Sequence, residues 1–188
     1  MYKEYENARN TAWQTLIKCN ISELPVRLGM IVDHFNAKIK NNSDVNILRD
    51  NQLGCIAILD SEKYIILDRT VSIQRQRYTL AHELGHIALK HTLQNIKLNR
   101  DSVIIYTDPQ EYEAERFATD ILAPACILWG LNLHSAEEIA EICNISIRSA
   151  EIRARRMETL YQRNKFLTHP LEQKLYTQFY DFVKNNRK

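Results

Sequence analysis

The stretch that decides the fold is Arg77-Tyr78-Thr79-Leu80-Ala81-His82-Glu83-Leu84-Gly85-His86, in which an HExxH pattern stands inside a helical run. Residues four apart on a helix lie about 40° apart around its axis and one turn along it, so His82 and His86 can reach one metal ion. Glu83 then points at a water in the open coordination position and can accept its proton. The pattern predicts a metal centre with two histidine ligands and Glu83 as the catalytic base.

The residues around this motif are apolar on nearly every side of the predicted helix, and they include Leu80, Ala81, Ile87, Ala88 and Leu89. A helix that is apolar almost all round is buried. Two histidines and a glutamate inside a core need a strong partner to offset their loss of water. The surroundings therefore favour a metal site over a surface helix with scattered charges.

A third protein ligand is expected, because catalytic zinc usually has three. The candidates lie in the run 108–118, whose helix has the apolar stripe Ala114, Phe117, Ala118, Ile121 and Leu122. At about 100° per residue, Glu111 lies about 50° from the centre of this stripe, Glu115 about 90° and Glu113 about 110°. Glu111 is best aimed inward, and the alternatives that stay open are Glu113, His91 and Asp120.

Other roles are open to the same side chains. Asp108 and Glu111 have the spacing of a capping box, which would use the Glu111 carboxylate structurally. Glu115 lies one turn after Glu111 and could hydrogen-bond a ligating histidine from behind. An oxyanion donor is also expected, and the sequence does not choose among Tyr78, Tyr106, Tyr112 and His91.

The composition of the whole chain describes an average globular protein. Its 188 residues are 45% hydrophobic and 26% charged, which suits one domain of ordinary size and excludes wholesale disorder. Four Gly and four Pro are too few for a chain full of tight turns and favour helix. The net charge of +2 does not by itself imply a polyanionic partner.

Apolar spacing predicts helices over 3–19 and, from an N-cap at Ser22, over a second stretch that ends near Lys40. Three β-branched runs predict a small antiparallel sheet, namely 45–48, 55–59 and 64–67. From about Ser72 the pattern is helical again, over 73–91, 109–122, 136–144, 147–165 and 170–185. The prediction is an α+β fold, predominantly helical, with a catalytic domain over 1–130 and a helical segment over 131–188.

Residues 135–156 have the pattern of a helix-turn-helix: Ala140 allows close packing and Asn144 stands at a turn that favours the left-handed conformation. The arginines that could meet DNA phosphates are Arg153, Arg155 and Arg156. Net charge is modest and no aromatic residues interleave with these arginines. A hairpin that packs on the catalytic domain or docks a partner is therefore favoured over DNA contact.

The four cysteines stand at 19, 55, 126 and 143, without any CxxC pair. The polar start of the chain lacks the apolar core of a signal peptide. Reduced, partly buried thiols in a cytoplasmic protein are the expectation. Because no run approaches the ~18 apolar residues that a membrane span requires, no membrane partner is expected.

Two segments together resemble the ImmA/IrrE family of metallopeptidases: the run 77–86 and Glu111-Tyr112-Glu113-Ala114-Glu115-Arg116-Phe117-Ala118-Thr119-Asp120-Ile121-Leu122-Ala123-Pro124. The resemblance implies a zincin-like domain with Glu83 as the base and with Zn²⁺ bound by His82, His86 and Glu111. The family usually has Asn or Asp where Glu115 stands, and Met where Ala123 stands.

Proteins of that family cleave helix-turn-helix (XRE-type) repressors of mobile elements or stress regulons. The resemblance therefore implies a zinc-dependent endopeptidase with a protein substrate. Two alternatives stay open: a non-catalytic zincin-shaped module that sequesters a regulator, and a DNA-binding regulator that acts through residues 135–156. A His/His/Glu ligand set favours zinc over manganese or iron without deciding between them.

Overall fold

The computed structural model describes residues 2–91 and 108–187 and has the predicted α+β, predominantly helical fold. In chain order its elements are α1 (Tyr2–Lys18), α2 (Leu28–His34), β1 (Ala37–Asn41), α3 (Asn42–Val45), β2 (Gly54–Leu59), β3 (Glu62–Leu67), α4 (Ile73–Ala88), α5 (Asp108–Leu122), α6 (Ala125–Gly130), α7 (Ala136–Cys143), α8 (Ile147–Arg163), α9 (Pro170–Gln178) and α10 (Tyr180–Asn186).

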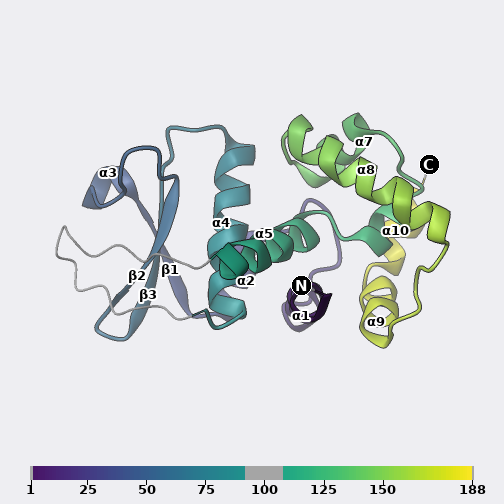
Figure 1. The fold of residues 1–188 in the computed structure, drawn as a ribbon, viewed down its shortest axis with the longest axis horizontal. Coiled ribbons are helices and arrows are strands. Elements are labelled where there is room, and N and C mark those ends of the chain that lie inside the picture. Colours follow the sequence, from purple (N-terminus) through teal and green to yellow (C-terminus); the bar gives the residue numbers. More distant parts are fainter. Residues whose placement is uncertain (1, 92–107, 188) are drawn as a thin grey trace.

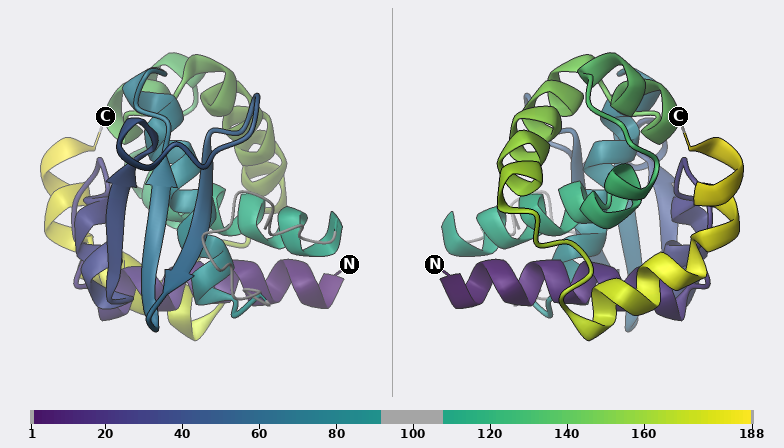
Figure 2. Two further views of the ribbon diagram at one scale, coloured as in Figure 1. Left: turned by 90° about the vertical axis from the view of Figure 1, so that its left-hand side faces the viewer. Right: turned by 90° about the vertical axis from the view of Figure 1, so that its right-hand side faces the viewer.

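Helix α4 is the central element of the molecule. One side of α4 packs on β2 and β3, and another side packs along α5 (Figure 1). Helix α1 contacts α4, α5 and α9, while α7 and α8 form a hairpin away from the sheet. Figure 2 shows the three strands side by side with the helices behind them. The helix that carries HExxH is thus held between the sheet and the other helices.

The sheet is mixed, so the prediction of an antiparallel sheet is wrong in one of its two pairings. The central strand β3 pairs antiparallel with β2 and parallel with β1. The run 45–48 is not a strand, because the Asn42 side chain accepts hydrogen bonds from the backbone N–H groups of Ile47 and Leu48 and folds this segment back on itself. The missed strand β1 carries Lys38 and Lys40, which suit an edge strand but disguise its β character.

The helix predicted from Ser22 begins only at Leu28. Leu24, Val26 and Leu28 are buried while Glu23, Pro25 and Arg27 are exposed. Burial at every second residue belongs to extended chain and not to a helix, so this segment reaches the core in an extended form. Two further differences are the short helix α6 after Pro124, and the division of the predicted helix 170–185 at the buried residue Phe179.

The predicted helix-turn-helix pattern agrees with the α7–α8 hairpin. Ser135 and Glu138 form a capping box at the start of α7, and Asn144 adopts the predicted left-handed conformation at φ 49°. The Arg77 guanidinium of α4 donates hydrogen bonds to the carbonyls of Asn144 and Val26. The hairpin is therefore fastened directly to the helix that carries the HExxH motif.

One buried apolar core extends from Ala12 in α1 to Val183 in α10 and takes in residues on both sides of the predicted boundary at 130/131. That boundary stays a prediction. The four cysteines are free thiols, and Cys19, Cys126 and Cys143 are buried. Within residues 2–91 and 108–187, no helix has both the length and the apolar character needed to cross a bilayer.

Candidate metal centre

Helix α4 presents His82, Glu83 and His86 on adjoining parts of its surface. The helix starts at Ser72, whose hydroxyl accepts a hydrogen bond from the backbone N–H of Arg75. It ends at Ala88, and two residues later Lys90, in the left-handed conformation at φ 57°, reverses the chain. The reversal brings the backbone N–H of His91 within 3.0 Å of the His86 carbonyl oxygen. This turn therefore places the His91 ring beside the His86 ring.

Three potential ligand groups from α4 and α5 converge. The Nε2 atoms of His82 and His86 lie 3.0 Å apart. From α5, Glu111 places Oε2 3.2 Å from His82 Nε2 and Oε1 3.7 Å from His86 Nε2. One donor atom from each residue lies within 4.8 Å of the other two, an arrangement that could hold a metal ion. These are the three residues that the sequence puts first as ligands.

Burial determines the protonation of the two histidines. The pKa of His82 is lowered to about 4, mainly by burial and also by His91. The pKa of His86, which is 0% exposed, is lowered to about 2 by burial and then by His82 and His91. Both imidazoles are therefore neutral near pH 7, the state in which a ring nitrogen offers its lone pair to a metal.

Glu83 is buried beside this cluster, and burial followed by the Glu111 charge raises its pKa to about 8. Within the described part of the chain, Glu83 Oε2 and His82 Nδ1 have no hydrogen-bond partner. A buried carboxylate without a partner is costly, and a nearby cation would offset that cost. Two neutral imidazoles and a carboxylate also match the ligand set of catalytic zinc sites. The residues present therefore fit a divalent metal ion.

A second row of polar groups lies behind His86. His86 Nδ1 is 2.9 Å from His91 Nδ1, and His91 Nε2 is 3.0 Å from Glu113 Oε2. His91 and Glu113 are thus placed behind a ligand and not among the ligand atoms, where the sequence left them as alternatives. Helical spacing within α5 places Glu113 far from its own apolar stripe. Because this spacing describes α5 alone, it could not show that His91, which follows the turn at Lys90, lies against the Glu113 carboxylate.

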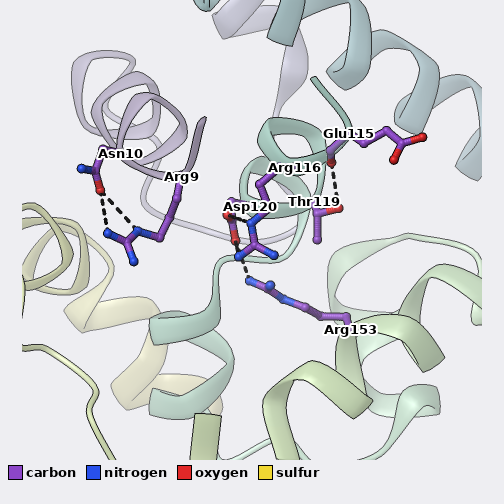
Figure 3. A network of polar contacts seen from close by, with 7 residues as sticks. All are labelled: Arg9, Asn10, Glu115, Arg116, Thr119, Asp120 and Arg153. Atoms are coloured by element: carbon purple, nitrogen blue, oxygen red, sulfur yellow. Dashed lines mark hydrogen bonds and ion pairs between the residues drawn. The ribbon is translucent and has the colours of Figure 1, made fainter. Parts of the chain in front are cut away.

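Two other acidic candidates lie away from the histidines. Asp120 is 1% exposed and binds Arg116 Nε at 2.8 Å and the Arg153 guanidinium at 3.0 Å (Figure 3). Glu115 has an exposed side chain whose carboxylate extends away from Asp120 (Figure 3). Among residues 2–91 and 108–187, Asp120 is paired with arginines, and no hydrogen bond or ion pair joins Glu115 to His82 or His86.

The predicted phosphate contacts differ in their exposure. Arg153 is 1% exposed and holds Asp120, so its guanidinium is inside the protein and cannot meet DNA. Arg155 is exposed and Arg156 is half-buried. Only part of the predicted arginine set is therefore on the surface.

Of the tyrosines offered as oxyanion donors, Tyr78 contacts a candidate ligand. Its ring stacks on His82 with the centroids 6.5 Å apart, and burial, followed by the charge of Glu115, raises its pKa to about 12. It therefore keeps its phenolic proton at neutral pH. Tyr112 is exposed and His91 is engaged with Glu113, while Tyr106 and the predicted Asp108 cap lie outside the described side chains.

Gly85 allows α4 and α5 to approach closely. A Cβ at this position would lie 3.1 Å from the Ala114 Cα and 3.2 Å from its carbonyl oxygen. Backbone atoms cannot rotate away, so a methyl group here must push α5 outward. The ligand Glu111 is on α5, one turn before Ala114. The glycine inside HExxH therefore sets how far Glu111 lies from the two histidines.

We expect Gly85→Ala to lower the free energy of unfolding by about 1–3 kcal/mol, as overpacking does, despite the better helix propensity of alanine. It should also weaken metal binding by displacing Glu111. Urea denaturation and metal titration check both effects. The matched control is Gly29→Ala in α2, where a Cβ meets nothing within 4 Å. Equal behaviour of the two variants would contradict the packing argument.

The comparison with known families agrees with this geometry. A family model described as Peptidase_M78, IrrE N-terminal-like domain, matches residues 37–155. The match includes the sheet, both helices that supply the candidate ligands, and the first half of α8. No curated protein matches the chain.

Proposed function

Because this chain belongs to the Peptidase_M78 family, whose model is described as an IrrE N-terminal-like domain, we propose that it is a zinc-dependent endopeptidase of the cytoplasm. Its proposed substrate is a helix-turn-helix transcriptional repressor. The observation that carries the proposal is the convergence of His82, His86 and Glu111, with Glu83 buried beside them. The repressor and the cellular location rest on the family resemblance.

In the proposed reaction, His82, His86 and Glu111 hold the metal, and Glu83 moves the proton. The chemistry that Zn²⁺ would supply when held there is polarisation of the scissile carbonyl and a pKa of water lowered towards ~7. Glu83 Oε2 accepts a proton from the attacking water and then gives it to the leaving amine nitrogen. Glu83 suits both steps, because it is buried next to His82 in the same helix and its carboxyl is held beside the candidate ligands.

The proposal is tested by incubating the purified, zinc-loaded protein with the helix-turn-helix repressor encoded nearest to its own gene. We expect two repressor fragments in the mass spectrum, and none after treatment with a zinc chelator. Zinc should restore cleavage to the chelated protein. A stable complex without fragments would instead identify a sequestering module and contradict the proposal.

The His91–Glu113 pair should strengthen metal binding through His86. A carboxylate–histidine pair behind a ligand fixes the ring orientation and tautomer, and its loss typically costs about 10–100-fold in metal affinity. We expect Glu113→Gln to weaken zinc affinity by that factor, measured by competition with a chromophoric chelator. The control is Glu115→Gln, two residues along α5, which should leave the affinity unchanged. Equal affinities for the two variants would rule out this role.

A further inference from the structure

A cavity of about 690 Å³ lies between α4, α5 and the start of α8. Its walls include Arg75 and Tyr78 from α4, Tyr112 and Arg116 from α5, and Arg148 and Ile152 from α8. The proposed metal centre uses none of these side chains as a ligand or base. A concave space of this size is in the range of binding sites for small molecules or a few residues of peptide.

The described lining of this α4–α5–α8 cavity is strongly basic. It contains five arginines and one glutamate, namely Arg75, Arg116, Arg148, Arg153, Arg156 and Glu115. Asp120 does not line the cavity itself but binds both Arg116 and Arg153 (Figure 3). Even with this aspartate counted, the formal charge around the cavity is positive. An anionic occupant is favoured, because guanidinium groups bind carboxylates through paired, charge-assisted hydrogen bonds.

The same cavity exposes large apolar side chains. Ile152 is 60% exposed and Tyr112 is 48% exposed, and they come from opposite walls, α8 and α5. Aromatic and aliphatic side chains that face each other across a basic groove suit an occupant with both carboxylates and apolar groups. An acidic peptide with interspersed apolar residues has this chemistry, whereas an inorganic anion does not.

The cavity begins within one helical turn of the candidate metal centre. Tyr78 is four residues before His82 on α4, and Tyr112 and Glu115 follow Glu111 on α5 by one and four residues. Four residues of helix span about 6 Å, roughly the length of two extended residues. A polypeptide that crosses the metal centre could therefore continue into the cavity.

We propose that the α4–α5–α8 cavity binds an acidic, partly apolar segment of the protein substrate, next to the bond that is cleaved. This inference rests on the proposed peptidase function and adds a substrate class to it. The exposed Arg75 and Arg148 select carboxylates, while Ile152 and Tyr112 contact apolar side chains between them. Substrate selection then depends on α8 as well as on α4 and α5.

DNA fits this surface less well. The α8 face that includes Arg148, Ile152 and Arg156 is turned towards α4 and α5 across the cavity. A helix that reads DNA must protrude into the major groove, which is about 12 Å wide. On this face α8 instead lines a cavity together with α4 and α5. Arg155 is exposed and does not line the cavity, which makes it a matched control.

The test uses the full chain in a Glu83→Gln background and a fluorescein-labelled decapeptide of alternating Glu and Leu. Fluorescence anisotropy compares it with a peptide that has Gln at each Glu. We expect the acidic peptide to bind at least about tenfold more tightly. Arg75→Glu and Arg148→Glu, on opposite walls, should each weaken binding at least about tenfold. Arg155→Glu changes the net charge equally and should alter the affinity less than about twofold.

Several results would overturn the inference: no binding of the acidic peptide, equal binding of the Gln peptide, or equal losses in Arg148→Glu and Arg155→Glu. Tighter binding of a DNA duplex than of the acidic peptide, weakened by Arg148→Glu, would assign the cavity surface to DNA instead. Thermal unfolding of each variant shows that it is folded. Peptide binding needs no turnover, so a failure to cleave would count against the proposed function and leave the cavity result standing.

Discussion

Glu83→Gln should bind zinc as tightly as the unchanged protein and cleave the substrate about 10²–10⁴-fold more slowly. The amide has nearly the same shape as the carboxylate but cannot accept the proton of the attacking water, and general-base catalysis contributes about this factor. Glu83 lies beside the ligand atoms but is not among the three that converge. Its replacement should therefore separate chemistry from metal binding.

Two measurements check this expectation: zinc content by elemental analysis, and initial rates of fragment formation. His86→Ala is the contrasting variant, because it removes a ligand and should lose both zinc and activity. If Glu83→Gln lost its zinc as well, Glu83 would be acting as a ligand. If it cleaved at the original rate, another group would be the base.

Asp120→Asn should lower the free energy of unfolding by about 3–5 kcal/mol. The Asp120 carboxylate is 1% exposed and lies between two guanidinium groups, those of Arg116 and Arg153. Breaking a buried ion pair by removing one partner costs about this much, because the remaining charge is left uncompensated. Here two like charges would remain side by side in the interior. The loss should be visible in urea denaturation as a lower midpoint at an unchanged slope.

Glu115→Gln is the matched control for this prediction, because it makes the same kind of change at an exposed site on the same helix. It should alter stability by less than about 0.5 kcal/mol. Adding Arg153→Leu to Asp120→Asn should recover part of the loss, since it removes one of the two guanidinium groups that would have lost the Asp120 carboxylate. Strictly additive losses in the double variant would contradict the assigned pairing.

The pair of Asp120 and Arg153 also joins the two parts of the chain that the sequence separates at 130/131. Asp120 is on α5 with the ligand Glu111, and Arg153 is on α8. Arg77 makes a second connection, from α4 to the turn after α7. These contacts place the basic and apolar side chains of α8 opposite the metal-site helices, which is the arrangement the substrate proposal uses.

Local spacing predicted much of the α4–α5 site and of the α7–α8 hairpin. His82 and His86 share a helix face because they are four residues apart, and the angle of Glu111 to its apolar stripe follows from the same period. Asn144 was predictable as a left-handed residue, because asparagine tolerates that conformation at a helix end. Each of these features depends on residues within a few positions of one another.

The sheet shows where local spacing fails. Strand β1 pairs with β3 in a parallel register that joins Ala37 to Lys63 and Asn41 to Leu67. Neither its lysines nor its length indicate a strand, and the partner lies more than twenty residues further along the chain. The β-branched run 45–48 looked more suitable, but hydrogen bonds to the Asn42 side chain hold it in a different conformation.

By itself, the sequence determined which helices carry the chemistry and which side chains lie on one face, because helical geometry repeats every 3.6 residues whatever surrounds it. Only the tertiary structure decided which residues pack opposite those helix faces. Because Gly85 has no side chain, α5 can pack close to α4. The turn at Lys90 places His91 behind His86, and Asp120 binds Arg153 in the protein interior. Contacts of this kind join residues that are distant in the chain, and no local period specifies them.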